Sequence, residues 1–180
     1  MKVPTAVILS GLFSLALVLP QAKAQQTAQD FPAAIAACGP AKIQFDVKPD
    51  KYVAPPPQVS ADKVLVYLFE NITRARMNGV LVRVGVDGKW IGATQSETYL
   101  TFLVDPGVHH LCVRAQGSWL ALAEDGIALH RLNAQMGMTY YFRTRISQPE
   151  GSTTTLLDAI DDDQAQLLLQ TSAHATSHPK

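Results

Sequence analysis

The sequence has no excess of charge of either sign. Its 180 residues contain 15 lysines and arginines and 15 aspartates and glutamates, so its formal net charge is zero. This balance argues against the basic surfaces that bind nucleic acid and against an acidic interaction tail. We therefore expect no nucleic-acid partner.

Motifs for catalysis are also missing. The chain has no GxSxG sequence, and the nearest match, Gln116–Trp119, lacks the second glycine. With two cysteines in the whole chain there is no CxxC pair for zinc or redox chemistry. We predict that the protein is not an enzyme and binds no metal or cofactor. The catalytic alternative is a metal-dependent enzyme that uses His109 or His130, with Asp105 or Glu124 as a carboxylate ligand.

The two adjacent histidines weaken that alternative. Neighbouring residues of a strand point to opposite faces, so His109 and His110 cannot easily share a metal ion. His109 is in phase with the apolar residues Leu111 and Val113. The pattern favours a core histidine that donates a hydrogen bond to a backbone carbonyl.

The longest uncharged apolar run lies at the N-terminus. Lys2 precedes residues 6–19, Pro20 ends the run, and Ala22-Lys23-Ala24 provides the small residues that signal peptidase accepts. This is the pattern of a secretory signal peptide cleaved after Ala24, which predicts a periplasmic or secreted protein without a stable membrane anchor. An uncleaved anchor helix would need a longer run.

Residues 35–39, Ile-Ala-Ala-Cys-Gly, look like a lipoprotein box, and a lipid anchor at Cys38 is the alternative localisation. In a lipoprotein the box directly follows the apolar run, whereas polar residues separate the two here.

An exported chain with two cysteines favours a disulfide between Cys38 and Cys112. A loop of about 75 residues makes that bond worth about 4–5 kcal/mol in the chain-entropy model.

The remaining chain reads as short strands separated by turn signals. Residues 42–47 alternate, prolines mark residues 48–60 as a connector, and residues 63–69 are apolar enough for a strand buried on both faces. Further strands are expected over residues 80–86, 89–92, 98–104, 108–114, 127–132, 138–146 and 153–157, with turns at Asp87-Gly88 and Asp105-Pro106-Gly107. This spacing predicts an all-β, antiparallel β-sandwich.

The C-terminal part changes its period. Residues 161–170 predict a short α-helix with three aspartates at its positive end. Their spacing is not that of an EF-hand calcium loop. Residues 171–180 show no apolar periodicity and predict a disordered tail. The predicted organisation is a signal peptide (1–24), an N-terminal segment and proline-rich connector with one strand (25–60), a β-sandwich domain (61–170) and the tail (171–180).

Two strings in this chain carry a family resemblance. Val84–Gly92 reads VGVDGKWIG, and Asp105–Cys112 reads DPGVHHLC. In this order they resemble the DUF2846 family of bacterial exported proteins and the PEGA repeats of surface proteins. The likeness extends over roughly residues 61–169. It implies a PEGA- or Ig-like sandwich in the cell envelope with no established activity and no catalytic residues.

A binding role depends on aromatic and arginine side chains. Trp90 and Trp119 lie next to turns, where they could be displayed to a sugar or peptide, or be buried in the core. Tyr141, Arg143 and Arg145 share one strand face, which could bind a ligand or be a solvated face with salt bridges. We predict a non-catalytic module that contacts an unknown envelope component, protein or glycan. The second alternative is a carbohydrate-binding module that uses Trp90 and Trp119.

Overall fold

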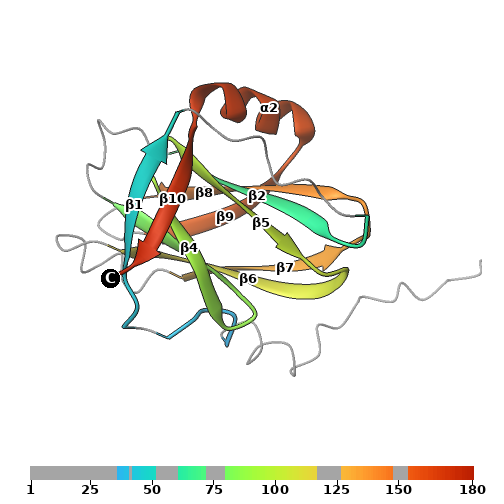
Figure 1. Cartoon of the computed structure of the whole chain (residues 1–180), viewed down its shortest axis with the longest axis horizontal. Helices are drawn as coiled ribbons and strands as arrows, with labels where there is room; N and C mark the ends of the chain where they lie inside the picture. Colours follow the sequence, from blue (N-terminus) through green and yellow to red (C-terminus); the bar gives the residue numbers. More distant parts are fainter. Residues whose placement is uncertain (1–35, 41, 52–60, 72–79, 117–126, 148–153) are drawn as a thin grey trace, which may run out of the picture.

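The fold is a two-layer β-sandwich. The computed structural model describes residues 36–40, 42–51, 61–71, 80–116, 127–147 and 154–180. One sheet has the strand order β1-β10-β5-β2-β8-β9, and the other has the order β4-β3-β6-β7 (Figure 1). The predicted all-β sandwich with a short C-terminal helix is confirmed.

The larger sheet consists of β1 (Phe45–Asp50), β10 (Ala173–Pro179), β5 (Thr98–Val104), β2 (Val64–Glu70), β8 (Thr139–Ser147) and β9 (Thr154–Ile160). The smaller sheet consists of β4 (Lys89–Gln95), β3 (Leu81–Val86), β6 (Gly107–Gln116) and β7 (Ile127–Ala134). Neighbouring strands are antiparallel except for the pairs β10–β5 and β2–β8, which are parallel.

The core between the sheets follows from two-residue alternation. Val82, Val84 and Val86 of β3 face Val64, Val66 and Leu68 of β2 in one buried cluster. All seven residues of β2 are buried. The apolar run up to Phe69 predicted a strand buried on both faces, whereas the burial of Glu70 was not predicted. The second face of β2 is covered because Leu65, Tyr67 and Phe69 pack with Tyr99 and with two helix residues, Ala165 and Leu168.

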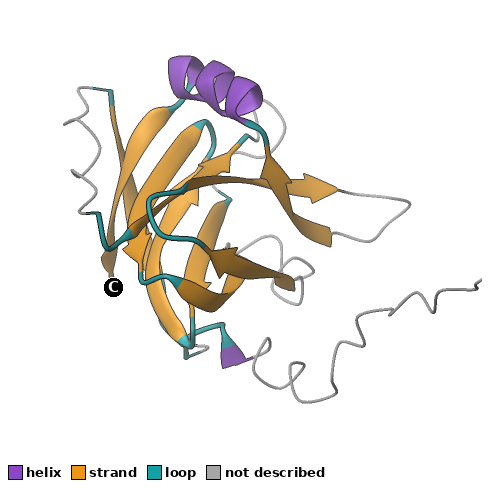
Figure 2. Cartoon of the chain, turned by 90° about the vertical axis from the view of Figure 1, so that its right-hand side faces the viewer, coloured by secondary structure: helices purple, strands orange, loops and turns teal. Residues whose placement is uncertain are grey.

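The helix α2 (Asp162–Thr171) confirms the predicted C-terminal helix. Asp161 is its N-cap and accepts a hydrogen bond from the backbone N–H of Gln164. Asp162 and Asp163 lie in the first turn, where the helix dipole favours negative charge. These roles account for all three aspartates. The helix lies outside the sandwich, at the top of Figure 2.

The predicted disordered tail is wrong. Ala173–Pro179 form β10, which pairs antiparallel with β1 along six residues and parallel with the start of β5. Its side chains are small or polar, so it shows no apolar period. Backbone pairing with two strands and burial of Ala173 and Ala175 hold it in place instead.

The N-terminal segment (residues 36–40 and 42–44) crosses the outer face of the smaller sheet before it enters β1. Ala37 is fully buried, and its carbonyl oxygen accepts a hydrogen bond from Gly88 N–H at 3.1 Å. The Gln116 side chain pairs with both backbone groups of Phe45, at 3.0 and 2.9 Å. An amide side chain at the end of β6 thus binds the first residue of β1 as another strand would.

Candidate functional site

Three turns lie at one end of the sandwich, which we call the turn end. They join β3 to β4, β5 to β6 and β7 to β8, and the last two lie close together at the right of Figure 1. Strand pairing brings Val64, Val104 and Thr139 to this same end. The described residues carry seven large exposed apolar side chains, and five of them are here: Ile91, Leu103, Val108, Met136 and Met138.

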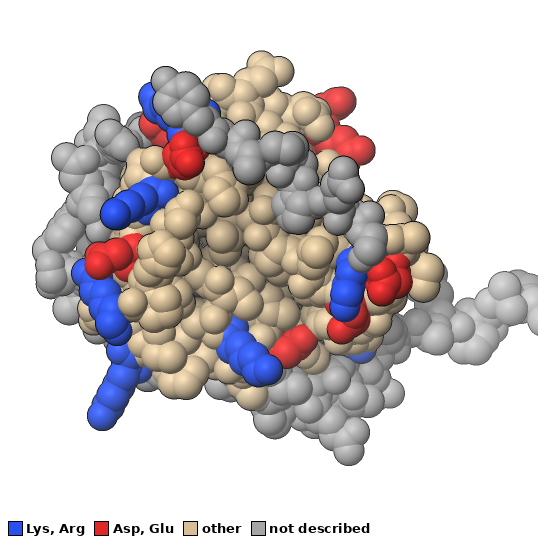
Figure 3. Space-filling model, in the orientation of Figure 1, with Lys and Arg blue, Asp and Glu red and all other residues tan. Residues whose placement is uncertain are grey.

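A cavity of about 340 Å³ opens at the turn end between β4 and β5, and we call it the end pocket. Its apolar lining is Val86, Ile91, Phe102, Leu103 and Val104, and its charged lining is Lys63, Asp87, Lys89, Asp105 and His109. The face that carries β4, β5 and β10 is largely uncharged at its centre, with charged side chains around it (Figure 3). The volume suits one or two side chains of a ligand.

Asp87 is held by the β3–β4 turn. Asp87 and Gly88 have φ angles of 49° and 84°, as expected for the two-residue turn that the Asp-Gly pair predicted. The carboxylate accepts the backbone N–H of His110 at 2.9 Å and lies 2.6 Å from Nδ1 of His109. Burial alone would raise the pKa of Asp87, but these two hydrogen bonds outweigh it and the pKa is lowered.

His109 joins two turns through its ring. Nδ1 lies 2.6 Å from Asp87 Oδ2, and Nε2 lies 2.7 Å from the carbonyl oxygen of Asp105. Both partners are acceptors, so only the protonated ring can donate to both. Burial lowers the pKa of His109, but the hydrogen bonds to Asp87 and Asp105 outweigh it and the pKa is raised. This contribution to stability is complete below the ordinary pKa and is lost as the pH rises through the raised value.

Most polar groups of the end pocket are bound to one another. The lining of the end pocket contains no serine, threonine or cysteine, and both nitrogens of His109 already face acceptors. A nucleophile next to a free base is therefore missing from this lining. Lys63 forms an ion pair with Asp105 at 2.5 Å. Lys89 forms no ion pair with the described residues and leaves one uncompensated positive charge at the rim.

The histidines do not assemble into a metal site within the described part of the chain. His130 packs edge-on against Phe142, with ring centroids 4.8 Å apart, and burial lowers its pKa. His110 lies on the other face of β6, where its Nε2 is buried without a described partner. No three His, Cys, Asp or Glu residues are grouped for a metal ion among the described positions. Glu124 lies outside them.

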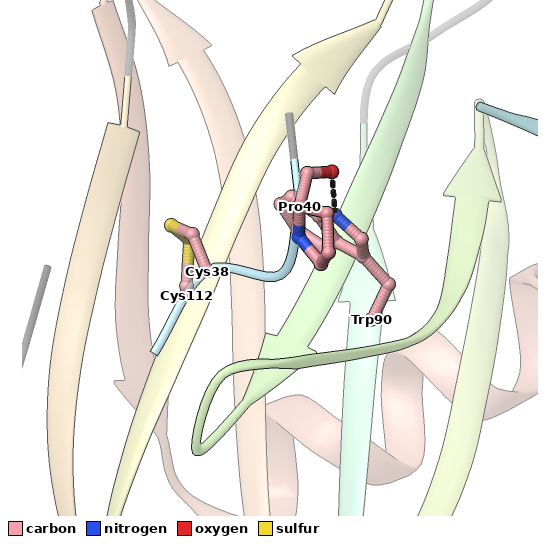
Figure 4. Close-up of a disulfide and its surroundings, with 4 residues drawn as sticks. All are labelled: Cys38, Pro40, Trp90 and Cys112. Atoms are coloured by element: carbon pink, nitrogen blue, oxygen red, sulfur yellow. Dashed lines mark hydrogen bonds between the residues drawn. A yellow bond between two sulfur atoms is a disulfide. The ribbon is translucent and has the colours of Figure 1, made fainter. Parts of the chain in front are cut away.

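Trp90 is packed under the N-terminal segment (Figure 4). Its Nε1 donates to the carbonyl oxygen of Pro40 at 2.8 Å, and the Arg83 guanidinium carbon lies 4.7 Å from its ring centroid. A Cβ on Gly39 would lie 2.4 Å from the ring, so only glycine fits there. Cys38 and Cys112 lie at disulfide distance beside this contact and are bonded, with Cα atoms 5.2 Å apart. Trp119 lies outside the described residues.

The other predicted surface residues lie on β8 of the larger sheet. Tyr141 packs against Tyr67 with ring centroids 5.3 Å apart, and burial raises the pKa of Tyr141. Asp158 of β9 forms ion pairs with Arg145 at 2.6 Å and with Arg143 at 3.9 Å. One carboxylate therefore serves both arginines, which matches the interpretation of a strand face with salt bridges.

The structure does not bring the predicted ligand-surface residues together. Trp90 belongs to the smaller sheet, whereas Tyr141, Arg143 and Arg145 belong to the larger one. The end pocket was not predicted. Its available signal was an aspartate in each of two turns that flank a histidine strand. Lys63, Lys89 and Leu103 carry no local signal, because only tertiary packing places them around one cavity.

Comparison with known proteins adds no information about the site, so its role is inferred from its own residues. No protein-family model, no curated protein and no solved structure matches this chain. The resemblance to the DUF2846 family therefore stays a prediction. In the described part of the chain, no helix is long and apolar enough to cross a membrane.

Proposed function

We propose that this protein is an exported, non-catalytic β-sandwich module that binds another component of the cell envelope through the turn end. The presence of five exposed apolar side chains at one end of the sandwich, two of which (Ile91 and Leu103) line a small cavity, carries this proposal. Exposed apolar side chains that gather at one end of a protein, some of them beside a concave site, are typical of a binding surface.

The other parts of the proposal come from the sequence. The signal-peptide pattern up to Ala24 and the disulfide between Cys38 and Cys112 fit an oxidising compartment outside the cytoplasm. The order of the VDGKWIG and DPGVHH strings fits an envelope protein of the DUF2846 or PEGA type. A binding role also agrees with a pocket lining that holds a histidine already bonded at both nitrogens and no hydroxyl or thiol nucleophile.

Site-specific photocrosslinking in cells tests this function. A photoreactive phenylalanine analogue replaces Leu103 or Met138 at the turn end. The control position is Leu167 on α2, whose side chain is 62% exposed but lies away from the pocket. We expect one discrete adduct from positions 103 and 138, its loss when Ile91→Asp is added, and no such adduct from position 167.

Two results would contradict the proposal. One is the absence of any adduct from positions 103 and 138, or an equal adduct from position 167. The other is stoichiometric zinc or a similar ion in metal analysis of the purified protein, which would favour the metal-dependent alternative.

A further inference from the structure

The end pocket lies at one end of a gap between β4 and β5. Another strand of the same chain, β10, occupies the other end of this gap. β4 and β5 follow each other in sequence but belong to different sheets. β10 lies between them along the first part of β5, where Ala173 N–H donates to Glu97 O at 2.9 Å. Further along, Ser177 Oγ accepts the backbone N–H of Ala93 on β4 at 3.1 Å. We call this gap the β4–β5 seam.

No described strand fills the second part of the seam. β10 pairs with β5 at two positions, through Ala173 and His174, and then follows β1 along its whole length. On this edge, β5 from Leu100 to Val104 pairs with no described strand, while its other edge pairs with β2. The end pocket lies at this unpaired part, between Lys89 and Ile91 of β4 on one side and the last three residues of β5 with Asp105 on the other.

Strand alternation shows which backbone groups point into the seam. The Glu97 carbonyl oxygen points to β10, because it accepts from Ala173. Backbone groups two residues apart in a strand point the same way. The N–H and C=O groups of Thr101 and Leu103 therefore point to the seam as well, with the pocket beside them.

We propose that an extended segment of a partner protein adds to β5 at this edge, bonding to the backbone of Thr101 and Leu103 and placing an apolar side chain in the end pocket. This inference rests on the proposed function and names its partner class. In strand addition, backbone hydrogen bonds provide affinity and side-chain pockets provide specificity. β10 shows that this edge of β5 accepts an added parallel strand.

The charges around the pocket define the segment further. Asp87 is bound to His109 and Asp105 to Lys63, which leaves the exposed Lys89 without an ion-pair partner among the described residues. An acidic residue next to the apolar anchor complements Lys89, and a basic residue there is repelled. The partner segment is an extended, alternating apolar sequence with an acidic residue.

Selection from a random decapeptide library displayed on phage tests this inference on the mature, disulfide-bonded protein. We expect enrichment of alternating apolar sequences with an acidic residue. Leu103→Pro removes the outward N–H without touching the bonds to β2, and proline is tolerated on such an edge. It should weaken binding of a selected peptide about tenfold, the size of one lost hydrogen bond. The matched variant Leu103→Ala keeps the N–H and should lose less.

Two further measurements keep the test valid if Leu103→Pro does not fold. N-methylation of the peptide at alternate residues should abolish binding to the wild-type protein in one register and leave the other unchanged. Lys89→Glu should weaken the binding of an acidic peptide by up to about fivefold, the effect expected for an exposed ion pair. Fold is monitored by circular dichroism and by the absence of free thiols.

The inference is overturned if no peptide is enriched, or if binding ignores both the proline and the N-methyl groups. Self-association that Leu103→Pro abolishes would assign the edge to a second copy of this chain and would also overturn it. If the crosslinked adducts at positions 103 and 138 persist while peptides fail, the proposed function stands and strand addition does not. If both fail, the turn end is not the binding surface.

Discussion

Trp90 and Ile91 are neighbours on β4, yet they belong to two very different surfaces. A register shift in the β3–β4 pairing leaves Ile91 without an opposite residue on β3. Trp90 lies under the N-terminal segment, fixed by Pro40 and Arg83. Ile91 lies at the rim of the end pocket and is 37% exposed.

The difference shows how the chain distributes its stabilising contacts. On the Trp90 side, a disulfide, a buried alanine and several hydrogen bonds fasten the N-terminal segment to the smaller sheet. On the Ile91 side, the described residues leave apolar side chains exposed and one edge of β5 unpaired. Apolar surface is thus covered beside the N-terminal segment and left exposed at the turn end, where we propose that a partner binds. Four changes test this contrast.

The largest effect is expected from the disulfide. Cys38→Ala with Cys112→Ala should lower the free energy of unfolding by about 2–5 kcal/mol, because the unfolded chain regains the entropy of a long loop. Urea unfolding of the oxidised protein and the double variant measures this. Trp90 fluorescence should change with the loosened segment, while amide exchange at the turn end stays as in the wild type. Equal loosening at both places would refute the contrast.

Gly39→Ala should have the next largest effect. The new Cβ would meet the Trp90 ring at 2.4 Å and Trp90 N at 2.7 Å, too close for packing without a shift. Overpacking of this kind costs about 1–3 kcal/mol. Lys42→Ala, an exposed position on the same segment, serves as the control and should stay within about 0.5 kcal/mol in thermal unfolding. Comparable losses in both variants would mean that the close contact with Trp90 is unimportant.

Asp87→Asn should change the pH dependence of the turn end. Asparagine suits the turn but does not hold the His109 proton, so the pKa of His109 should fall. In the wild type, the stabilisation from His109 is lost as the pH rises through its raised pKa, and the variant should lack this step. Asp87 is 45% exposed, so the effect is at most about 1 kcal/mol. NMR titration of His109 in both proteins measures this change. An unchanged pKa of His109 would contradict its contact with Asp87.

Leu103→Asp should have the smallest effect on stability and a large one on binding. Its side chain is 38% exposed, so the free energy of unfolding should change by less than about 0.5 kcal/mol. Crosslinking from Met138 should nevertheless disappear. If the variant unfolds early, Leu103 contributes to the fold and the turn end is less open than we infer.

Sequence patterns predicted most strands because burial imposes a local period. Val82, Val84 and Val86 alternate since one face meets the core, and the Asp-Gly turn fixes where β3 ends. The contact expected for His109 with a backbone carbonyl is present at Asp105, but its side chain is 15% exposed at a pocket rim. Its second partner, Asp87, carries only a turn signal in the sequence.

The amino-acid sequence by itself determined the all-β class, the positions of most strands, the helix capped by Asp161 and the pairing of Cys38 with Cys112. The strands and the helix depend on patterns among neighbouring residues, and the disulfide follows from the presence of only two cysteines. The sequence therefore shows these features directly. Only the tertiary structure decided that residues 173–179 form β10, that β4 and β5 separate into different sheets, and that a pocket opens beyond β10. Backbone hydrogen bonds between distant segments decide these features, and such bonds need no particular side chain.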